Sequence, residues 1–148
     1  MANRPASVLP AASPEFTLEL TVEDADVDAL GHVNNIVYVR WLQDVATAHA
    51  NAVGVSHAEL IRIGAVFVVR KHEIEYLLPG FLGEHITLRT HVSWWRGASC
   101  ERVTSIERTT DRAVLARAKT LWAFVNAQTG KPTRLPPEIV AAFAGPAA

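Results

Sequence analysis

The run NNIVYVRWLQDVATAHANAVG, residues 34–54, has the pattern of a long helix. Apolar side chains recur at intervals of three and four residues, which is the spacing of one helix face: Val37, Tyr38, Trp41, Leu42 and Val45. Gly54 is typical of the residue that ends a helix. Because Ile36, Val39 and Ala46 widen the apolar arc, we expect a helix of about five turns that is largely enclosed by the rest of the fold.

The segments around this helix have the patterns of strands. Before it, Phe16, Leu18 and Leu20 alternate with polar residues. After it, Ser56 and Glu59 form the capping box of a short helix to residue 63. Strand-like runs come next at residues 65–78, 84–95, 99–109 and 113–126, and residues 135–143 suggest a terminal helix with proline in its first turn. The clearest alternation assigns one face of the second run to Ile86, Leu88, Thr90, Val92 and Trp94.

This order of elements, a strand, a long apolar helix and then four strands with short connections, predicts an α+β fold. A five-stranded antiparallel sheet that curls around the helix would bury both apolar surfaces. The edges of such a sheet favour an oligomer, at least a dimer. We find no repeat and no linker, so residues 15–148 are expected to form one domain, preceded by a short disordered leader at residues 1–14.

Composition excludes several classes of protein. The chain has 148 residues, 49% of them hydrophobic and 20% charged, which is typical of a globular domain. Its net charge of −1 gives no electrostatic basis for binding nucleic acid or a membrane. A lone cysteine, Cys100, fits a reducing compartment, and no apolar run approaches a membrane span. We therefore expect a cytoplasmic protein.

Reactive side chains concentrate just before the long helix, at residues 26–38. The segment holds Asp26, Asp28, His32, Asn34 and Asn35. The unpaired N–H groups of a helix start can polarise a bound carbonyl and hold an oxyanion. A carboxylate beside them can act as a base or nucleophile. However, Asp and Asn before a helix are also the commonest capping residues, so the spacing alone leaves catalysis and simple capping both open.

The same run, DVDALGHVNNIVYVRW at residues 26–41, closely resembles the signature of the 4-hydroxybenzoyl-CoA thioesterase family, in its broad branch of acyl-CoA thioester hydrolases. VRKHEIEYLLPGFLGE, residues 69–84, is similar to the family's second strand and its turn. ARAKTLWAFVN, residues 116–126, and the segment through residue 136 are similar to its last strand and tail. The resemblance covers residues 16–143, and it implies the hot-dog fold, in which the sheet wraps the long helix.

The resemblance also implies residue roles. The second Asp of the pair, Asp28, matches the catalytic carboxylate, and the family's oxyanion donors are backbone N–H groups that fall near Asn34 and Asn35. Gly31 and Tyr38 match the family's glycine and aromatic positions. The implied activity is hydrolysis of an acyl-CoA without a cofactor. The implied assembly is a homodimer with two active sites at the subunit interface, often paired into a tetramer.

Several other residues are candidates with two interpretations each. Asp26 is expected to hold the loop, and His32 to position substrate or pack rather than protonate a thiolate that leaves readily. Tyr38 is expected in the core with a satisfied hydroxyl, whereas Tyr76 fits either the core or an acyl pocket. Basic side chains that would meet CoA phosphates are Arg96, Arg70, Lys71 and Lys119. Arg70 and His72 share the parity of apolar residues, which indicates a β-bulge or a pair that faces a pocket.

Other chemistries lack the required spacing. The six histidines form no metal-ligand cluster, and Cys100 has no evident base beside it. Two alternatives to a thioesterase stay open: a hot-dog dehydratase of hydroxyacyl thioesters, which would pair His32 with a carboxylate, and a non-catalytic acyl-CoA-binding module. The sequence also leaves open the acyl group, CoA against acyl-carrier protein, and attack by Asp28 against general-base catalysis.

Overall fold

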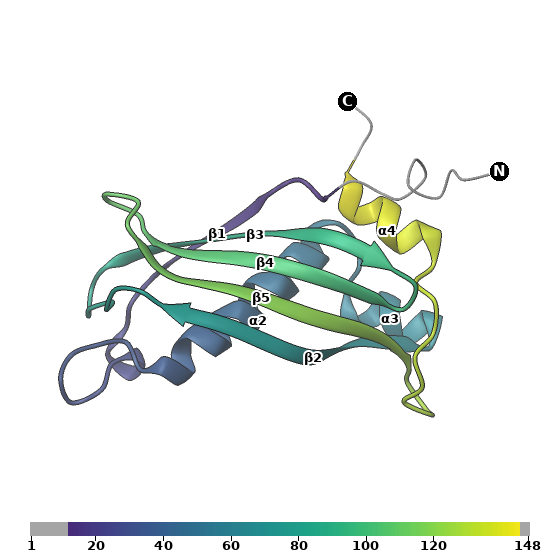
Figure 1. The fold of residues 1–148 in the computed structure, drawn as a ribbon, viewed down its shortest axis with the longest axis horizontal. Helices are drawn as coiled ribbons and strands as arrows, with labels where there is room; N and C mark the ends of the chain where they lie inside the picture. The colour runs from purple at the N-terminus through teal and green to yellow at the C-terminus, as the bar shows by residue number, and fades with distance from the viewer. Residues whose placement is uncertain (1–11, 146–148) are drawn as a thin grey trace.

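A computed structural model describes residues 12–145 and consists of one antiparallel sheet laid across one long helix (Figure 1). The sheet has the strand order β1-β3-β4-β5-β2. In chain order the elements are β1 (Phe16–Thr21), the short 3-10 helix η1 (Asp24–Asp26), α2 (Asn35–Ala52), α3 (His57–Ile63), β2 (Ala65–Tyr76), β3 (His85–Arg96), β4 (Ser99–Arg108), β5 (Val114–Asn126) and α4 (Pro137–Ala144). The predicted α+β hot-dog arrangement with five antiparallel strands is confirmed.

The helix α2 begins and ends where the sequence indicates. The side chain of Asn34 caps it by accepting a hydrogen bond from the backbone N–H of Ile36, and Gly54 lies just after it with a φ of +86°. The face with apolar spacing is buried against the sheet. Ile36, however, is 74% exposed, so the prediction of a largely enclosed helix was wrong for that residue. The sheet covers one side of the helix, and Ile36 lies on the exposed side with Arg40 and Asp44.

Two groups of buried side chains fill the space between α2 and the sheet. The first packs the N-terminal half of α2 onto the middle of the sheet, through Val37, Trp41, Val45, Ile86, Leu88, Ile106 and Leu115. The second lies at the other end of α2, where α3 and α4 close the fold, and includes Leu60, Trp95, Phe124, Leu135 and Phe143. The two ends of the helix are therefore packed by different parts of the chain.

Two β-bulges change which side chains face inward. A register shift between Val92 and Trp94 in β3 reverses the alternation, so that Trp95 is buried and Trp94 is not. The predicted alternation, which put Trp94 on one face with Ile86, Leu88 and Val92, therefore fails at the end of the strand. A second shift, between Val69 and Lys71 in β2, is the bulge that the parity of Arg70 and His72 suggested.

The ends of the described range carry two further observations. Most of the expected leader, residues 1–11, lies outside the described residues. Ser13, at its end, is buried and exchanges hydrogen bonds with the backbone of Val92, so the folded part begins slightly before residue 15. The terminal helix has Pro137 in its first turn, as predicted. None of the helices between residues 12 and 145 is both long enough and apolar enough to cross a membrane.

Candidate active site

The loop between β1 and α2 is held by the buried carboxylate of Asp26. Its Oδ2 accepts a hydrogen bond from the backbone N–H of Glu23 at 2.8 Å, and its Oδ1 accepts one from Nη2 of Arg40 at 2.6 Å. The side chain of Asp26 is only 5% exposed, whereas that of Arg40 is 54% exposed. These contacts tie the loop to the first turns of α2, in agreement with the structural role expected for Asp26.

Asp28 lies in the same loop, with an exposed carboxylate whose orientation is fixed by the backbone. Its Oδ1 accepts hydrogen bonds from the N–H groups of Leu30, at 2.9 Å, and His32, at 3.2 Å. Its own backbone N–H donates to the carbonyl of His32, and Gly31 makes the tight turn between them with a φ of +79°. Because both donors bind Oδ1, Oδ2 is left available for a reacting molecule.

The start of α2 narrows the choice of oxyanion donor. The N–H of Asn34 donates to the carbonyl of Asp26 at 2.9 Å, so this predicted donor is already engaged within the chain. The N–H groups of Ile36 and Val37 bind the side chain and carbonyl of Asn34. Among the described residues, none accepts a hydrogen bond from the N–H of Asn35. Asn35 is therefore the first free donor at the positive end of the helix dipole.

A shallow cavity of about 270 Å³ brings most of the predicted site together. It is lined by residues of the loop, the first turn of α2 and the end of β2: Asp28, His32, Val33, Asn35, Tyr38, Tyr76, Leu77, Leu78 and Pro79. The His32 ring stands edge-on to Phe81 with centroids 5.0 Å apart, so packing sets its position. Gly31 shapes the loop and does not line the cavity.

Two tyrosines form the floor and side of this cavity. Tyr38 is buried and its ring stands edge-on to that of Tyr76, with centroids 5.5 Å apart. Burial raises the pKa of Tyr38, and a hydrogen bond with the backbone of Gly80 opposes that shift. The Tyr76 hydroxyl donates to the carbonyl of Asn35 at 3.4 Å. Tyr38 is thus a core residue with its hydroxyl at the cavity, and Tyr76 belongs to the cavity rather than the core.

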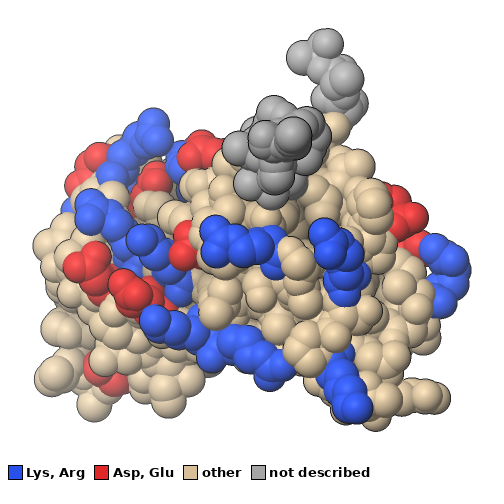
Figure 2. Space-filling model, turned by 45° about the vertical axis from the view of Figure 1, so that its right-hand side comes forward, with Lys and Arg blue, Asp and Glu red and all other residues tan. Residues whose placement is uncertain are grey.

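The basic residues predicted to contact CoA phosphates do not line the cavity at Asp28. Arg96 ends β3 at the far end of the sheet, with its guanidinium 5.1 Å from the ring centroid of Trp94. Arg70 is exposed at the bulge of β2, beside exposed Lys71, and Lys119 is exposed on β5. Figure 2 shows Lys and Arg side chains in a band across one face of the molecule. Within one chain, neither Arg70 nor Arg96 lines the cavity that holds Asp28.

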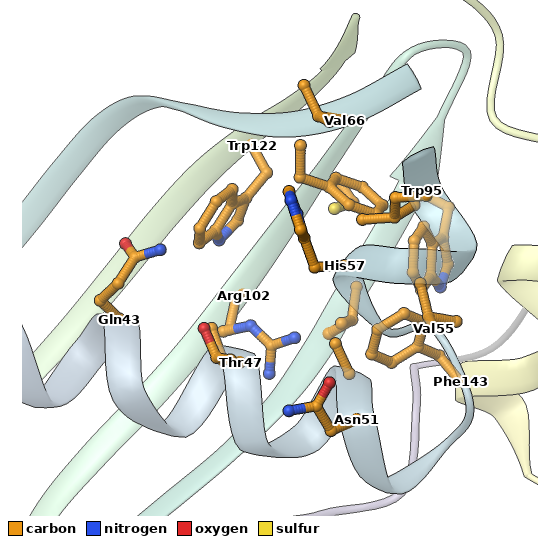
Figure 3. Close-up of a pocket in the computed structure, with 16 residues that line it drawn as sticks. Gln43, Thr47, Asn51, Val55, His57, Val66, Trp95, Arg102, Trp122 and Phe143 are labelled. Carbon is orange, nitrogen blue, oxygen red and sulfur yellow. The ribbon is translucent and has the colours of Figure 1, made fainter. Parts of the chain in front are cut away.

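A second, larger cavity of about 450 Å³, which no sequence motif indicated, lies at the other end of α2 (Figure 3). Arg102 of β4 lines it and is buried. Its signal in the sequence is a charged residue at the inward parity of Cys100, Thr104 and Ile106. Cys100 itself is buried, as expected, and burial raises the pKa of its thiol to about 12. No three His, Cys, Asp or Glu side chains between residues 12 and 145 are grouped to hold a metal ion.

Comparison with known proteins places the chain among thioesterase-like proteins. Residues 22–143 match the model of the thioesterase-like superfamily. The acyl-CoA thioester hydrolase YbgC of Escherichia coli O6:H1 is 31% identical over 131 residues, which cover 86% of this chain and 95% of the relative.

Two solved structures share the fold. The 1,4-dihydroxy-2-naphthoyl-CoA thioesterase Slr0204 of Synechocystis superposes with a TM-score of 0.81 at 19% identity, covering 88% of this chain and 96% of the other. SAV2348 of Staphylococcus aureus, solved in complex with CoA, superposes with a TM-score of 0.83 at 17% identity, covering 89% and 83%. Because the family match spans both cavities and strands β2 to β5, the chain belongs to the thioesterase-like superfamily of hot-dog proteins.

Proposed function

We propose that this protein hydrolyses an acyl-CoA thioester to a free acid and CoA, with Asp28 as the reacting carboxylate and no cofactor. The reaction class rests on membership of the thioesterase-like superfamily and on the similarity to an acyl-CoA thioester hydrolase. The 4-hydroxybenzoyl-CoA branch is the finer assignment, proposed from the motif at residues 26–41. The observation that carries the site is the carboxylate of Asp28 in one cavity with the free N–H of Asn35.

The chemistry depends on these two groups. The thioester carbonyl would accept a hydrogen bond from the Asn35 N–H, which stabilises the oxyanion that forms on attack. In one route Oδ2 of Asp28 attacks the carbonyl, CoA leaves as its thiolate, and water then hydrolyses the mixed anhydride. In the other route Asp28 takes a proton from the water that attacks. His32, held by Phe81, would position the thioester rather than supply a proton.

The surroundings of the cavity support a second copy of the chain at the site. Leu77, Leu78 and Phe81 are at least 41% exposed, and Leu30 and Ile36 are 78% and 74% exposed. Exposed apolar side chains gathered around one site are typical of an interface. We therefore propose a homodimer or dimer of dimers with its active sites between subunits and, because a lone cysteine fits a reducing compartment, a cytoplasmic location. In such an assembly Arg70 and Arg96 would contact CoA only from the other subunit.

The decisive experiment measures release of free CoA from a panel of acyl-CoA substrates with a thiol reagent. Wild-type protein is expected to release CoA, and Asp28→Asn is expected to fold normally and release it far more slowly. Binding without release would instead identify an acyl-CoA-binding module, and a product that keeps the thioester would identify a dehydratase. A parallel panel of acyl-carrier protein thioesters tests the carrier.

A single turnover in oxygen-18 water distinguishes the two routes. If Asp28 attacks the thioester, water that opens the mixed anhydride at the Asp28 carbonyl leaves label in that carboxylate. General-base catalysis places label only in the acid that is released. Mass analysis of the peptide that contains Asp28, after one turnover and after many, reads out the difference.

A further inference from the structure

Arg102 is a buried cation in a cavity that is lined mainly by apolar and aromatic side chains, with Gln43, Thr47, Asn51 and His57 as its other polar lining residues. It is 6% exposed and extends from the inner face of β4 into the cavity of about 450 Å³ at the C-terminal half of α2. Figure 3 shows it among the lining residues, with Trp122 and Phe143 on different sides of it. The aromatic part of the lining consists of Phe67, Trp95, Trp122 and Phe143.

The partners of Arg102 are all neutral. Its Nη1 donates to Nδ1 of His49 at 2.9 Å and to Oγ1 of Thr90 at 3.2 Å. Burial, together with the positive charge of Arg102, lowers the pKa of His49 to about 4, so its ring is uncharged at neutral pH. The Cys100 thiol, with its raised pKa, is uncharged as well. Burial also lowers the pKa of Arg102 to about 10, which leaves the guanidinium cationic at neutral pH.

No described carboxylate pairs with Arg102. Among the described residues, five other arginines form ion pairs with Asp or Glu, and every one of their side chains is at least 25% exposed. The segments outside the described range, residues 1–11 and 146–148, contain no Asp or Glu. A buried cation without a counterion is costly, and the Phe143 ring, with its centroid 5.9 Å from Cζ of Arg102, offsets only part of that cost.

The geometry of the guanidinium indicates what would neutralise it. Nε of Arg102 is buried and has no hydrogen-bond partner among residues 12–145, and the hydrogen bonds that the side chain makes with these residues leave from Nη1. The edge formed by Nε and Nη2 is the one that Arg108 uses to bind both oxygens of the Asp111 carboxylate, at 3.0 and 2.8 Å. Arg62 binds Glu59 through the same edge. In Arg102 this carboxylate-binding edge has no partner among the described residues: Nε is enclosed and unpaired, and no hydrogen bond leaves Nη2.

We propose that this cavity is a binding site for an organic monocarboxylate with an apolar body. The carboxylate accepts a hydrogen bond from Nη2 of Arg102 and, once the guanidinium turns toward the cavity, one from Nε, while the apolar body lies among the aromatic side chains. A volume of about 450 Å³ is within the range of small-molecule sites. The site shares no lining residue with the cavity at Asp28, so its occupancy does not depend on the proposed thioesterase activity.

The test compares octanoate with octanol, its neutral counterpart, by titration calorimetry and by the fluorescence of the tryptophans. Wild-type protein is expected to bind octanoate at least about tenfold more tightly, because only the carboxylate forms a charged hydrogen-bond pair with Arg102. Equal affinity for the two probes would overturn the proposal. Asp28→Asn is expected to bind octanoate as the wild type does, which separates this result from any failure of catalysis.

Two variants locate the binding in the cavity. Arg102→Met removes the charge at similar volume and is expected to lose the preference for octanoate while it still binds octanol. Ala50→Leu fills the cavity, leaves the charge of Arg102 in place and is expected to lower the affinity for both octanoate and octanol. Arg117→Met removes an exposed charge on β5 and serves as the matched control. Unchanged octanoate affinity in Arg102→Met or in Ala50→Leu, with folding confirmed by circular dichroism, contradicts the proposal. The result from either variant is sufficient by itself to contradict the proposal.

Discussion

The two cavities at the ends of α2 hold opposite charges in opposite settings. Asp28 carries a negative charge at the surface, and backbone N–H groups only two and four residues away orient it. Arg102 carries a positive charge in the interior, and its partners His49 and Thr90 come from α2 and β3. A charge that is accessible and oriented is suited to chemistry, whereas a buried charge without a counterion is suited to binding one. The comparison predicts distinct effects for changes at each end.

The largest effect is expected from Asp28→Asn. The variant keeps the hydrogen-bond acceptor that shapes the loop but loses the base or nucleophile, so kcat should fall by about 10³-fold, equivalent to about 4 kcal/mol. Asp24→Asn, an exposed carboxylate of the same loop, is the matched control and should keep full activity. Stopped assays of CoA release give both values. Full activity in Asp28→Asn would remove this residue from the mechanism.

The next largest effect is a pH dependence of stability that comes from His49, the hydrogen-bond partner of Arg102. Burial, with smaller contributions from nearby Arg102 and His91, lowers the pKa of His49 from its ordinary 6.5 to about 4 in the folded protein. The unfolded chain therefore binds the proton more readily between these values. The stability that depends on neutral His49 is fully present above pH 6.5. It is lost as the pH falls from 6.5 to 4, because the unfolded chain then gains a proton that the folded protein does not. The loss should be about 3 kcal/mol.

Urea unfolding at a series of pH values measures this dependence. His49→Asn keeps an acceptor near the Nδ1 position and should flatten the curve between pH 6.5 and 4. The exposed His57 offers the matched control, and His57→Asn should leave the curve as it is in the wild type. A curve that stays equally steep in His49→Asn would assign the dependence to other groups.

A smaller effect is expected from Asp26→Ala. The substitution leaves the N–H of Glu23 without an acceptor and Arg40 without its carboxylate, at a cost of about 2 kcal/mol since Arg40 is half exposed. Because Asp26 anchors the loop that orients Asp28, activity should fall as well. Asp44→Ala removes the weaker, exposed partner of Arg40 and should change stability by less than about 0.5 kcal/mol. Chemical denaturation gives both differences in free energy.

The smallest effect tests the packing under the Asp28 cavity. A Cβ on Gly80 would lie 3.0 Å from Cγ2 of Val33 and 3.3 Å from the Tyr38 hydroxyl oxygen. Gly80→Ala should therefore cost about 1 kcal/mol and shift the Tyr38 hydroxyl in the cavity floor. A thermal melt measures the cost, and the change in KM for acyl-CoA shows whether the floor moved. An unchanged melting temperature would mean that Val33 gives way freely.

The parts of the molecule that could be predicted from sequence are those held by local interactions. The helix from Asn34 to Gly54 and the loop around Asp28 depend on side chains a few residues apart, so their pattern is visible in the sequence. The inward position of Trp95 in place of Trp94 depends on a bulge, and one extra residue in a strand reverses every prediction of facing beyond it. The exposure of Ile36 depends on which side of α2 the sheet leaves uncovered.

The Arg102 cavity could not be predicted for a different reason. Its lining comes from α2, α3, four strands and α4, and no short motif joins them. A charged residue at inward parity looks like poor alternation in the sequence, and β4 has the weakest sequence pattern of the strands. The structure shows that the strand alternates regularly, with Arg102 and Thr104 as its polar inward residues.

The position of β2 at the edge of the sheet determines how a second copy can add to it. Within the part of the chain that the structure describes, β2 pairs only with β5, so the backbone groups of its other side are open to another strand. An antiparallel copy centred on His72 would place Lys71 opposite Glu73 at two symmetric positions, whereas parallel in-register stacking would place each charge on its like. The charges of this edge thus favour closed pairing of two chains and oppose open-ended growth into fibrils.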